Sequence, residues 1–374
     1  MRLPAAALIV LTGLLHPGYP VVRVTGEPPR WRLEPLSVIV SPDGAGFARL
    51  FGVLLDPKGG VVVVDAKEKV IYRFTDQGKL LGTTGRVGSG PAEFRVPYTV
   101  AWLGEELMVY DPMNSRISRW DRNGTIVGLL PNNARLTGQL PAFAGAGGTA
   151  WLRQGGLGPS GKYQSSYVRF ASTGPRDTIW YPYEPPMAPS REPPKGHDGY
   201  VVCLQKGGFS WFYSPFSEAA NKTVVTLDGQ LLAVDGVDYR LAVMRAPGDT
   251  VKVLEHVVTR APISDDEWKD GLKEYQDHLA SNPGTSCSGR QVRPKAKPAI
   301  RDLATDPTGR VWVERYMPQG LLWEAWQGDK VVGSFAVPDT ARNELTSFTA
   351  DRVAFARYRE EDGGYEVRVY RIRR

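Results

Sequence analysis

The chain has 374 residues, of which 42% are hydrophobic and 23% charged, with 41 glycines and 30 prolines spread along its length. This length suits two average domains or one large all-β domain, and the composition excludes a wholly disordered chain. The formal net charge of +6 arises from lysines and arginines that are interleaved with acidic residues. That pattern argues against a nucleic-acid-binding surface, so we expect no nucleic-acid partner.

The N-terminus predicts a secretory signal. Arg2 precedes the apolar run Ala5–Leu15, which is too short to cross a bilayer as a helix. We therefore expect residues 1–20 to be a signal peptide, whose cleavage site the sequence does not define. The protein is then exported to the periplasm or the extracellular space. No later apolar run reaches membrane-spanning length, so no membrane span is expected.

Residues 51–83 predict a β-meander, because strand-like apolar runs alternate there with turn sequences such as Asp56–Gly59. The same interval separates an aspartate from a glycine three times along the chain: Asp65 and Gly78, Asp111 and Gly124, and Asp235 and Gly248. β-Meanders that recur at regular spacing are typical of a β-propeller.

Two segments resemble a known family. Tyr110–Ile117 resembles the D-x-x-N-x-R-I core of NHL-type propeller repeats. Gly85–Phe94, followed by Pro97, resembles the G-R-x-G-x-G-P-x-E-F…P connector of six-bladed, NHL-like propeller proteins exported by bacteria, with Ala92 where the family more often has glycine. A glycine-rich phosphate cradle is the alternative, but it would open a helix and carry Lys-Ser/Thr, whereas Pro91 and another strand follow here.

The rest of the chain predicts further repeats of the same kind. A degenerate third repeat ends in a proline-rich loop at residues 181–199, and the fourth ends near Gly248. The fifth opens at Asp306–Val313, and the last lies in residues 345–374. We expect Leu36–Ser41 to complete the last blade beside the C-terminal strand, which would leave no free sheet edge. The resemblance thus implies an all-β, six-bladed β-propeller as a single domain over residues 21–374.

One segment, at about residues 258–297, interrupts this pattern with an inserted amphipathic helix. Ser264-Asp265-Asp266-Glu267 is a capping box with an acidic first turn, and Pro283-Gly284 ends the helix. Four apolar residues share one helical face: Trp268, Leu272, Tyr275 and Leu279. We expect this face to pack against a blade, with a mobile lid as the alternative.

The two cysteines, Cys203 and Cys287, lie outside the repeat cores. In an exported protein a disulfide between them is the plain expectation, and two reduced buried thiols are the alternative. A metal site built on these two residues alone would lack ligands.

The connector contains the candidate ligand-binding residues Arg86, Glu93 and Arg95. One interpretation makes them a charged cluster at a channel mouth that binds a peptide or an anionic ligand. The other is structural: Glu93 and Arg86 bond to each other across the connector and hold it in place. The structural interpretation is favoured because a long glycine-rich connector needs such anchoring.

Enzyme templates find little support in the sequence. Beyond the presumed signal there are three histidines, and none occupies an equivalent place in two repeats; they are His197, His256 and His278. Asp56, Asp306 and Asn221 are candidates for a lactonase-like calcium site, but turn formation explains the two aspartates. No nucleophile-elbow motif is present.

The functional prediction is a monomeric binding or scaffolding module without cofactor. It recognises a protein, peptide or small ligand at a channel mouth. The alternative is a metal-dependent, lactonase-like hydrolase or a lyase, for which calcium is the possible cofactor.

Overall fold

The computed structural model describes residues 19–131, 143–145, 149–157, 163–171, 173–181, 199–205, 208–216, 222–234, 237–246, 249–338, 343–361 and 363–374. Most of the predicted signal peptide and of the proline-rich loop lies outside these residues, as do Asp235, Gly248, Asn221 and His197.

The chain is all-β apart from two α-helices and one short 3-10 turn in the described residues. Six sheets, which we number 1 to 6, follow one another along the chain, and each is a meander. Sheet 1 contains β3 (Leu50–Leu55), β4 (Val61–Asp65), β5 (Val70–Phe74) and β6 (Leu80–Thr84). Sheet 2 contains β7 (Thr99–Leu103), β8 (Glu106–Asp111), β9 (Arg116–Trp120) and β10 (Ile126–Pro131). Sheet 3 contains β11 (Phe143–Gly145), β12 (Thr149–Leu157), β13 (Tyr163–Ala171) and β14 (Gly174–Tyr181).

The second half of the chain continues the series. Sheet 4 contains β17 (Thr223–Val225), β18 (Leu231–Val234), β19 (Arg240–Ala246) and β20 (Asp249–His256), and β1 (Val21–Val24) adds a parallel fifth strand beside β20. Sheet 5 contains β22 (Ile300–Thr305), β23 (Val311–Tyr316), β24 (Leu321–Gln327) and β25 (Lys330–Ala336). Sheet 6 contains β26 (Asn343–Phe348), β27 (Arg352–Arg359), β28 (Gly364–Arg373) and β2 (Arg32–Ile39).

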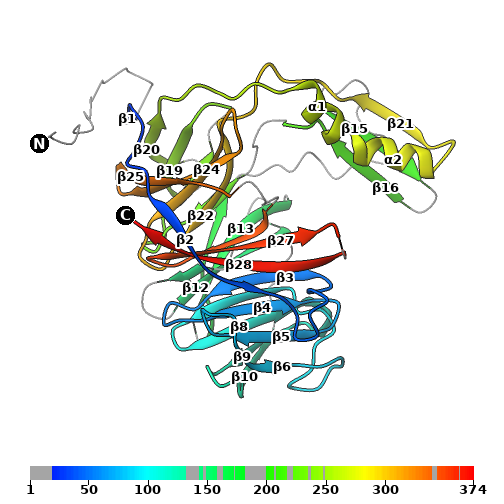
Figure 1. The fold of residues 1–374 in the computed structure, drawn as a ribbon, viewed down its shortest axis with the longest axis vertical. Helices are drawn as coiled ribbons and strands as arrows, with labels where there is room; N and C mark the ends of the chain where they lie inside the picture. The colour runs from blue at the N-terminus through cyan, green and yellow to red at the C-terminus, as the bar shows by residue number, and fades with distance from the viewer. Residues whose placement is uncertain are drawn as a thin grey trace, which may run out of the picture.

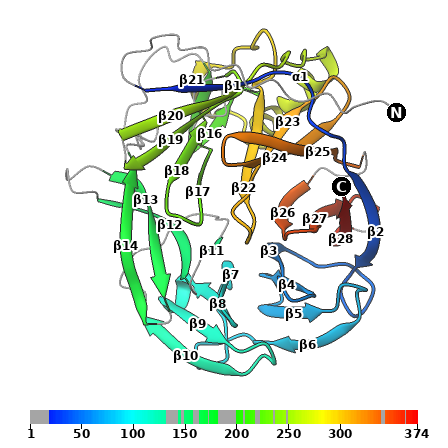
Figure 2. The same cartoon turned by 90° about the vertical axis from the view of Figure 1, so that its left-hand side faces the viewer.

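Figure 2 shows the six sheets following one another around a ring in chain order. The first strand of each meander is the innermost. β3 lies against β7 and β26, β7 lies against β11, and β22 lies against β17 and β26. Between sheets 3 and 4, β14 lies against β19, and the hydroxyl of Tyr167 on β13 donates to the carbonyl of Thr223 on β17 at 2.7 Å.

The packing of sheet 1 shows why its second strand is continuously apolar. All four residues of Val61–Val64 are buried. Val61 and Val63 pack into the core shared with sheet 6, whereas Val62 and Val64 pack into the core shared with sheet 2. A strand buried on both faces needs apolar side chains at every position rather than at alternate ones.

The N-terminal strap, residues 21–39, runs along the outside of three sheets. After β1 pairs with β20, Arg30 forms a bridge with Ser334 of sheet 5, and β2 then pairs antiparallel with β28. The predicted pairing of the segment around Leu36 with the C-terminal strand is therefore confirmed, although the strand begins earlier, at Arg32. The strap thus provides β20 of sheet 4 and β28 of sheet 6 with a neighbouring strand at the outer edge.

A seventh sheet lies apart from the ring. It is three-stranded and contains β16 (Gly208–Tyr213), β15 (Tyr200–Gln205) and β21 (Ser286–Arg290). With α1 (Asp265–Gly271) and α2 (Lys273–Ser281) it forms what we call the satellite unit, which Figure 1 shows projecting from the ring near sheets 4 and 5. Cys203 and Cys287 face each other across β15 and β21, and a disulfide joins them.

The helical segment differs from the expectation in two ways. The capping box between Ser264 and Glu267 is present, but the helix is interrupted at Leu272, next to Gly271, where an added Cβ would lie 2.5 Å from Pro215. The helices also pack on the satellite sheet rather than on a sheet of the ring, and the ring of Tyr275 lies 5.2 Å from that of Phe212 in a tilted arrangement. Neither helix is long and apolar enough to span a membrane, and the described chain contains no other α-helix.

Candidate functional site

The two faces of the ring carry different connections between strands. In an antiparallel meander of four strands, the connection from the outer strand of one sheet to the inner strand of the next always reaches the same face. We call this the connector face, and the opposite face, which carries the tight turns between first and second strands, the turn face. The satellite unit is built from two successive connectors, those between sheets 3 and 4 and between sheets 4 and 5.

Arg301 lies at the start of β22, where this inner strand meets the connector face. The register of β22 against β23 shifts between Ile300 and Asp302, so Arg301 sits in a β-bulge. Bulges re-aim a side chain and occur often beside functional sites. Here the bulge brings Nη1 of Arg301 within 2.5 Å of Oε2 of Glu314 on β23, while Arg301 keeps 31% of its side chain exposed.

Glu314 is the unusual member of this pair, because only 1% of it is exposed. Burial raises the pKa of Glu314 to about 7, although the guanidinium of Arg301 acts in the opposite direction. Its Oε1 atom has no hydrogen-bond partner among the described residues. A buried carboxyl that titrates near neutral pH, with one oxygen unpaired, costs stability and is a recognised mark of a functional site.

Further charges surround this pair at the connector face. Lys222, just before the inner strand of sheet 4, lies 3.2 Å from the carboxylate of Asp302, and both side chains are about half exposed. Lys297, which is buried, attaches the satellite unit: its Nζ lies 2.5 Å from Glu267 of α1 and 5.3 Å from the ring centres of Phe216 and Tyr316.

The predicted connector residues lie on the same face, at the junction of sheets 1 and 2. Glu93 accepts hydrogen bonds from the backbone N–H of Gly90 at 2.7 Å and from Nε of Arg86 at 2.9 Å. Those two bonds hold the pKa of Glu93 below its usual value. Arg95 donates its backbone N–H to Asp111 at 2.8 Å. The structure thus brings Arg86 and Glu93 together within the connector, with Arg86 largely exposed.

The repeated aspartates have a structural role. Asp65 accepts the backbone N–H of Ala48 at 2.7 Å, and Asp111 accepts that of Arg95, so each ties the incoming connector to the turn after the second strand. Asp56 and Asp306 cap their own turns by accepting a backbone N–H two residues later, from Lys58 and Thr308 respectively. These bonds explain why aspartate recurs at both places without invoking a ligand.

The two described histidines also have local partners. His256, buried on β20, hydrogen-bonds through Nδ1 to Glu324 at 3.0 Å and through Nε2 to the carbonyl of Gly26 in the strap. Arg315 donates to Glu324 at 2.6 Å and reaches Glu27 of the strap, so this buried charged group fastens the strap to sheets 4 and 5. His278 lies on α2, 4.7 Å from the ring of Phe212.

The Arg301–Glu314 pair was not among the residues that the sequence singled out. A signal was present, since Glu314 and Arg315 are charged residues in a strand that begins Val-Trp-Val. Charged side chains in a buried strand need partners of opposite charge, but the sequence does not identify those partner residues.

No protein-family model matches the chain, and no curated protein matches it significantly. Solved structures resemble it over most of its length. A Bacteroides fragilis protein described as exported has a TM-score of 0.49 at 11% identity, covering 94% of this chain and 100% of its own. An aldose sugar dehydrogenase from Streptomyces coelicolor has a TM-score of 0.45 at 14% identity, with 93% and 100% covered. A virginiamycin B lyase from Staphylococcus aureus has a TM-score of 0.40 at 10% identity, with 91% and 99% covered. At these values no activity transfers to this chain.

Proposed function

We propose that the protein is an exported six-bladed β-propeller that binds an acidic group of a peptide or small ligand at the connector face, with Arg301 as the contact residue. The succession of six meanders, the ring of inner strands and the closure of sheet 6 by the strap support the propeller assignment. Export rests on the apolar N-terminal run of the sequence.

The observation that carries the binding proposal is the Arg301–Glu314 pair. An arginine offers a planar fork of donors suited to a carboxylate, and Arg301 is both partly exposed and held in position by its buried partner. Glu314 sets how much of the arginine's charge is neutralised. Protonation of Glu314 as the pH falls through about 7 leaves Arg301 with uncompensated charge, so an anion binds more tightly at the lower pH.

Calorimetric titration with a triglutamate peptide, at pH 6 and at pH 8, tests this function. We expect tighter binding at pH 6, a loss of about tenfold in R301Q, equivalent to about 1.4 kcal/mol, and binding that no longer changes between the two pH values in E314Q. R245Q is the matched control, because Arg245 is an exposed arginine paired with Asp249 at the turn-face end of sheet 4. Equal binding by wild type, R301Q and R245Q would contradict the proposal.

The alternative, a metal-dependent hydrolase or lyase, has no assigned residues. The described part of the chain holds no group of three or more His, Cys, Asp or Glu placed to hold a metal ion. Elemental analysis of the purified protein decides between the two functions, because stoichiometric calcium or zinc would support the enzyme.

A further inference from the structure

Arginines bridge neighbouring sheets on the turn face. From sheet 5, Nη2 of Arg310 reaches the carbonyls of Thr349 and Ala350 in sheet 6. From sheet 6, Nη2 of Arg352 reaches the carbonyl of Asp56 in sheet 1 at 2.7 Å. From sheet 1, Arg73 reaches the carbonyl of Asn123 in sheet 2 at 2.6 Å. At each of these three junctions a guanidinium occupies the space between the sheets and satisfies backbone carbonyls.

Two of these arginines hold the same place in their sheets, immediately before or at the start of the second strand. The carbonyl of Arg310 closes its turn by accepting the N–H of Asp306, and the carbonyl of Arg352 accepts that of Thr349. In sheet 4 the equivalent bond runs from the N–H of Thr226 to the carbonyl of Gln230. Gln230 therefore stands where sheets 5 and 6 have an arginine, and its side chain is shorter and uncharged.

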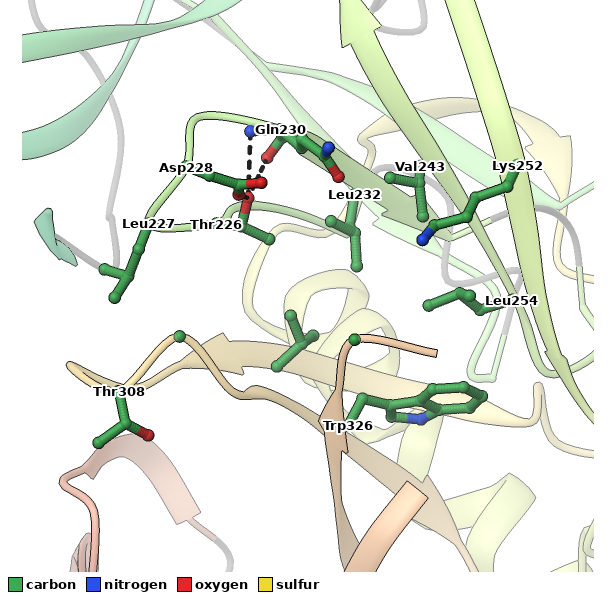
Figure 3. A pocket seen from close by; sticks show the side chains of 13 residues that line it. Thr226, Leu227, Asp228, Gln230, Leu232, Val243, Lys252, Leu254, Thr308 and Trp326 are labelled. Atoms are coloured by element: carbon green, nitrogen blue, oxygen red, sulfur yellow. Dashed lines mark hydrogen bonds between the residues drawn. The ribbon is translucent and has the colours of Figure 1, made fainter. Parts of the chain in front are cut away.

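A cavity of about 300 Å³ opens at this junction, between sheets 4 and 5. Its inner wall is apolar and consists of Leu232, Val243, Leu254, Val311 and Trp326. Gln230 and Lys252 lie on one side of it, and Thr308 lies across from them on the next turn, as Figure 3 shows. The side-chain amide of Gln230 makes no hydrogen bond within the part of the chain that the structure describes.

Charges at the rim favour a cation or a neutral molecule over an anion. Lys252 is already neutralised, because its Nζ lies 2.5 Å from Asp329. Asp228, on the turn that forms the upper edge in Figure 3, adds a further negative charge that no described basic side chain pairs. An apolar wall with a few polar groups at its mouth, in a cavity of this size, is the usual form of a small-molecule site.

We propose that this cavity binds a compact organic cation, a guanidinium or amidinium that carries an apolar group, in the place where sheets 5 and 6 use their own arginine. The apolar group lies against Leu232, Leu254 and Trp326. The cationic head lies between the free amide of Gln230 and the next turn, with Asp228 as counter-charge. The site is on the face opposite Arg301 and is independent of the function proposed there.

Three probes of nearly the same shape test the charge preference: benzamidine, benzamide and benzoate. Calorimetry on the full-length protein should give binding in the order benzamidine, benzamide, benzoate. Equal binding of all three, or preference for benzoate, overturns the proposal.

Two substitutions at Gln230 should change the affinity for benzamidine in opposite directions. Q230R supplies a guanidinium from the chain itself, so it should reduce benzamidine binding by at least about tenfold, equivalent to about 1.4 kcal/mol, and should raise the melting temperature. Q230E keeps the size of the side chain and adds a negative charge, so it should strengthen benzamidine binding. Q276R, on the exposed surface of α2, is the matched control and should change neither quantity. Undiminished benzamidine binding in a folded Q230R, or weaker binding in Q230E, contradicts the proposal.

Discussion

Truncation of Phe94 tests whether the glycine-rich connector is a structural element or a binding site. Phe94 has no exposed surface, and its ring lies 5.8 Å from that of Trp120 in the core between sheets 1 and 2. The connector is folded tightly around it, since a Cβ added at Gly85 would lie 2.3 Å from the ring. Gly85 has a positive φ of 95°, so glycine is required there for backbone reasons as well.

The cost of Phe94→Ala follows from this burial. Removing a fully buried phenylalanine ring typically costs about 3–5 kcal/mol, the sum of lost transfer free energy and the remaining cavity. The backbone bonds of the connector, such as Phe94 N–H to the carbonyl of Arg86 at 2.7 Å, do not involve the ring and should persist. Glu93→Gln removes a charge from an ion pair whose partner, Arg86, is 79% exposed. Such surface pairs contribute about 0–1 kcal/mol.

Urea unfolding followed by tryptophan fluorescence measures both variants, with the free energy of unfolding obtained by linear extrapolation. Leu81→Ala is the control, because Leu81 is 60% exposed and should change stability by no more than about 0.5 kcal/mol. The expected order of destabilisation is Phe94→Ala far above Glu93→Gln, with Leu81→Ala near wild type. If Phe94→Ala stays within about 1 kcal/mol of wild type, the ring does not hold the connector and the structural role is refuted.

Three further outcomes are expected. Burial alone would lower the pKa of His256, but its hydrogen bond to Glu324 raises that pKa. The stability from this pair is therefore complete below pH about 6.5 and declines as the pH rises through the raised pKa. Urea midpoints measured from pH 6 to 9 should fall in wild type, and an equal fall in H256N would contradict this. Arg310→Gln should cost about 3–5 kcal/mol because it leaves the buried carboxylate of Asp306 without its charged partner. A melting temperature equal to that of wild type would count against this expectation. Cys203 and Cys287, separated by 84 positions, should resist alkylation until they are reduced. Reduction should lower the free energy of unfolding of the segment that they close by about 4 kcal/mol. Two alkylated thiols in native protein would exclude the bridge.

The sequence by itself determined the features that depend on neighbouring residues. The turns after Asp56 and Asp306 could be predicted because an aspartate followed three residues later by glycine caps a tight turn wherever it stands. The capping box at Ser264 is equally local. The apolar run Val61–Val64 indicated a buried strand, and regular spacing of such strands indicated a series of meanders.

Tertiary structure alone decided the features that join distant segments. The satellite sheet depends on β15 pairing with β21, whose cysteines are 84 positions apart, and neither strand carries a repeat pattern that predicts its partner. The interruption of the helix at Leu272 arises where Gly271 meets Pro215 of the other connector.

The candidate sites belong to this second group. Arg301 reaches Glu314 only because a bulge shifts the register of β22, and register is set by packing on both faces of a sheet rather than by local propensity. The cavity at Gln230 lies where sheet 4 meets sheet 5 and has glutamine in place of the arginine that sheets 5 and 6 carry at the same position. A glutamine in a turn does not stand out in the sequence, and only the tertiary structure places Gln230 at the rim of a cavity, with Thr308 of the next sheet on the other side.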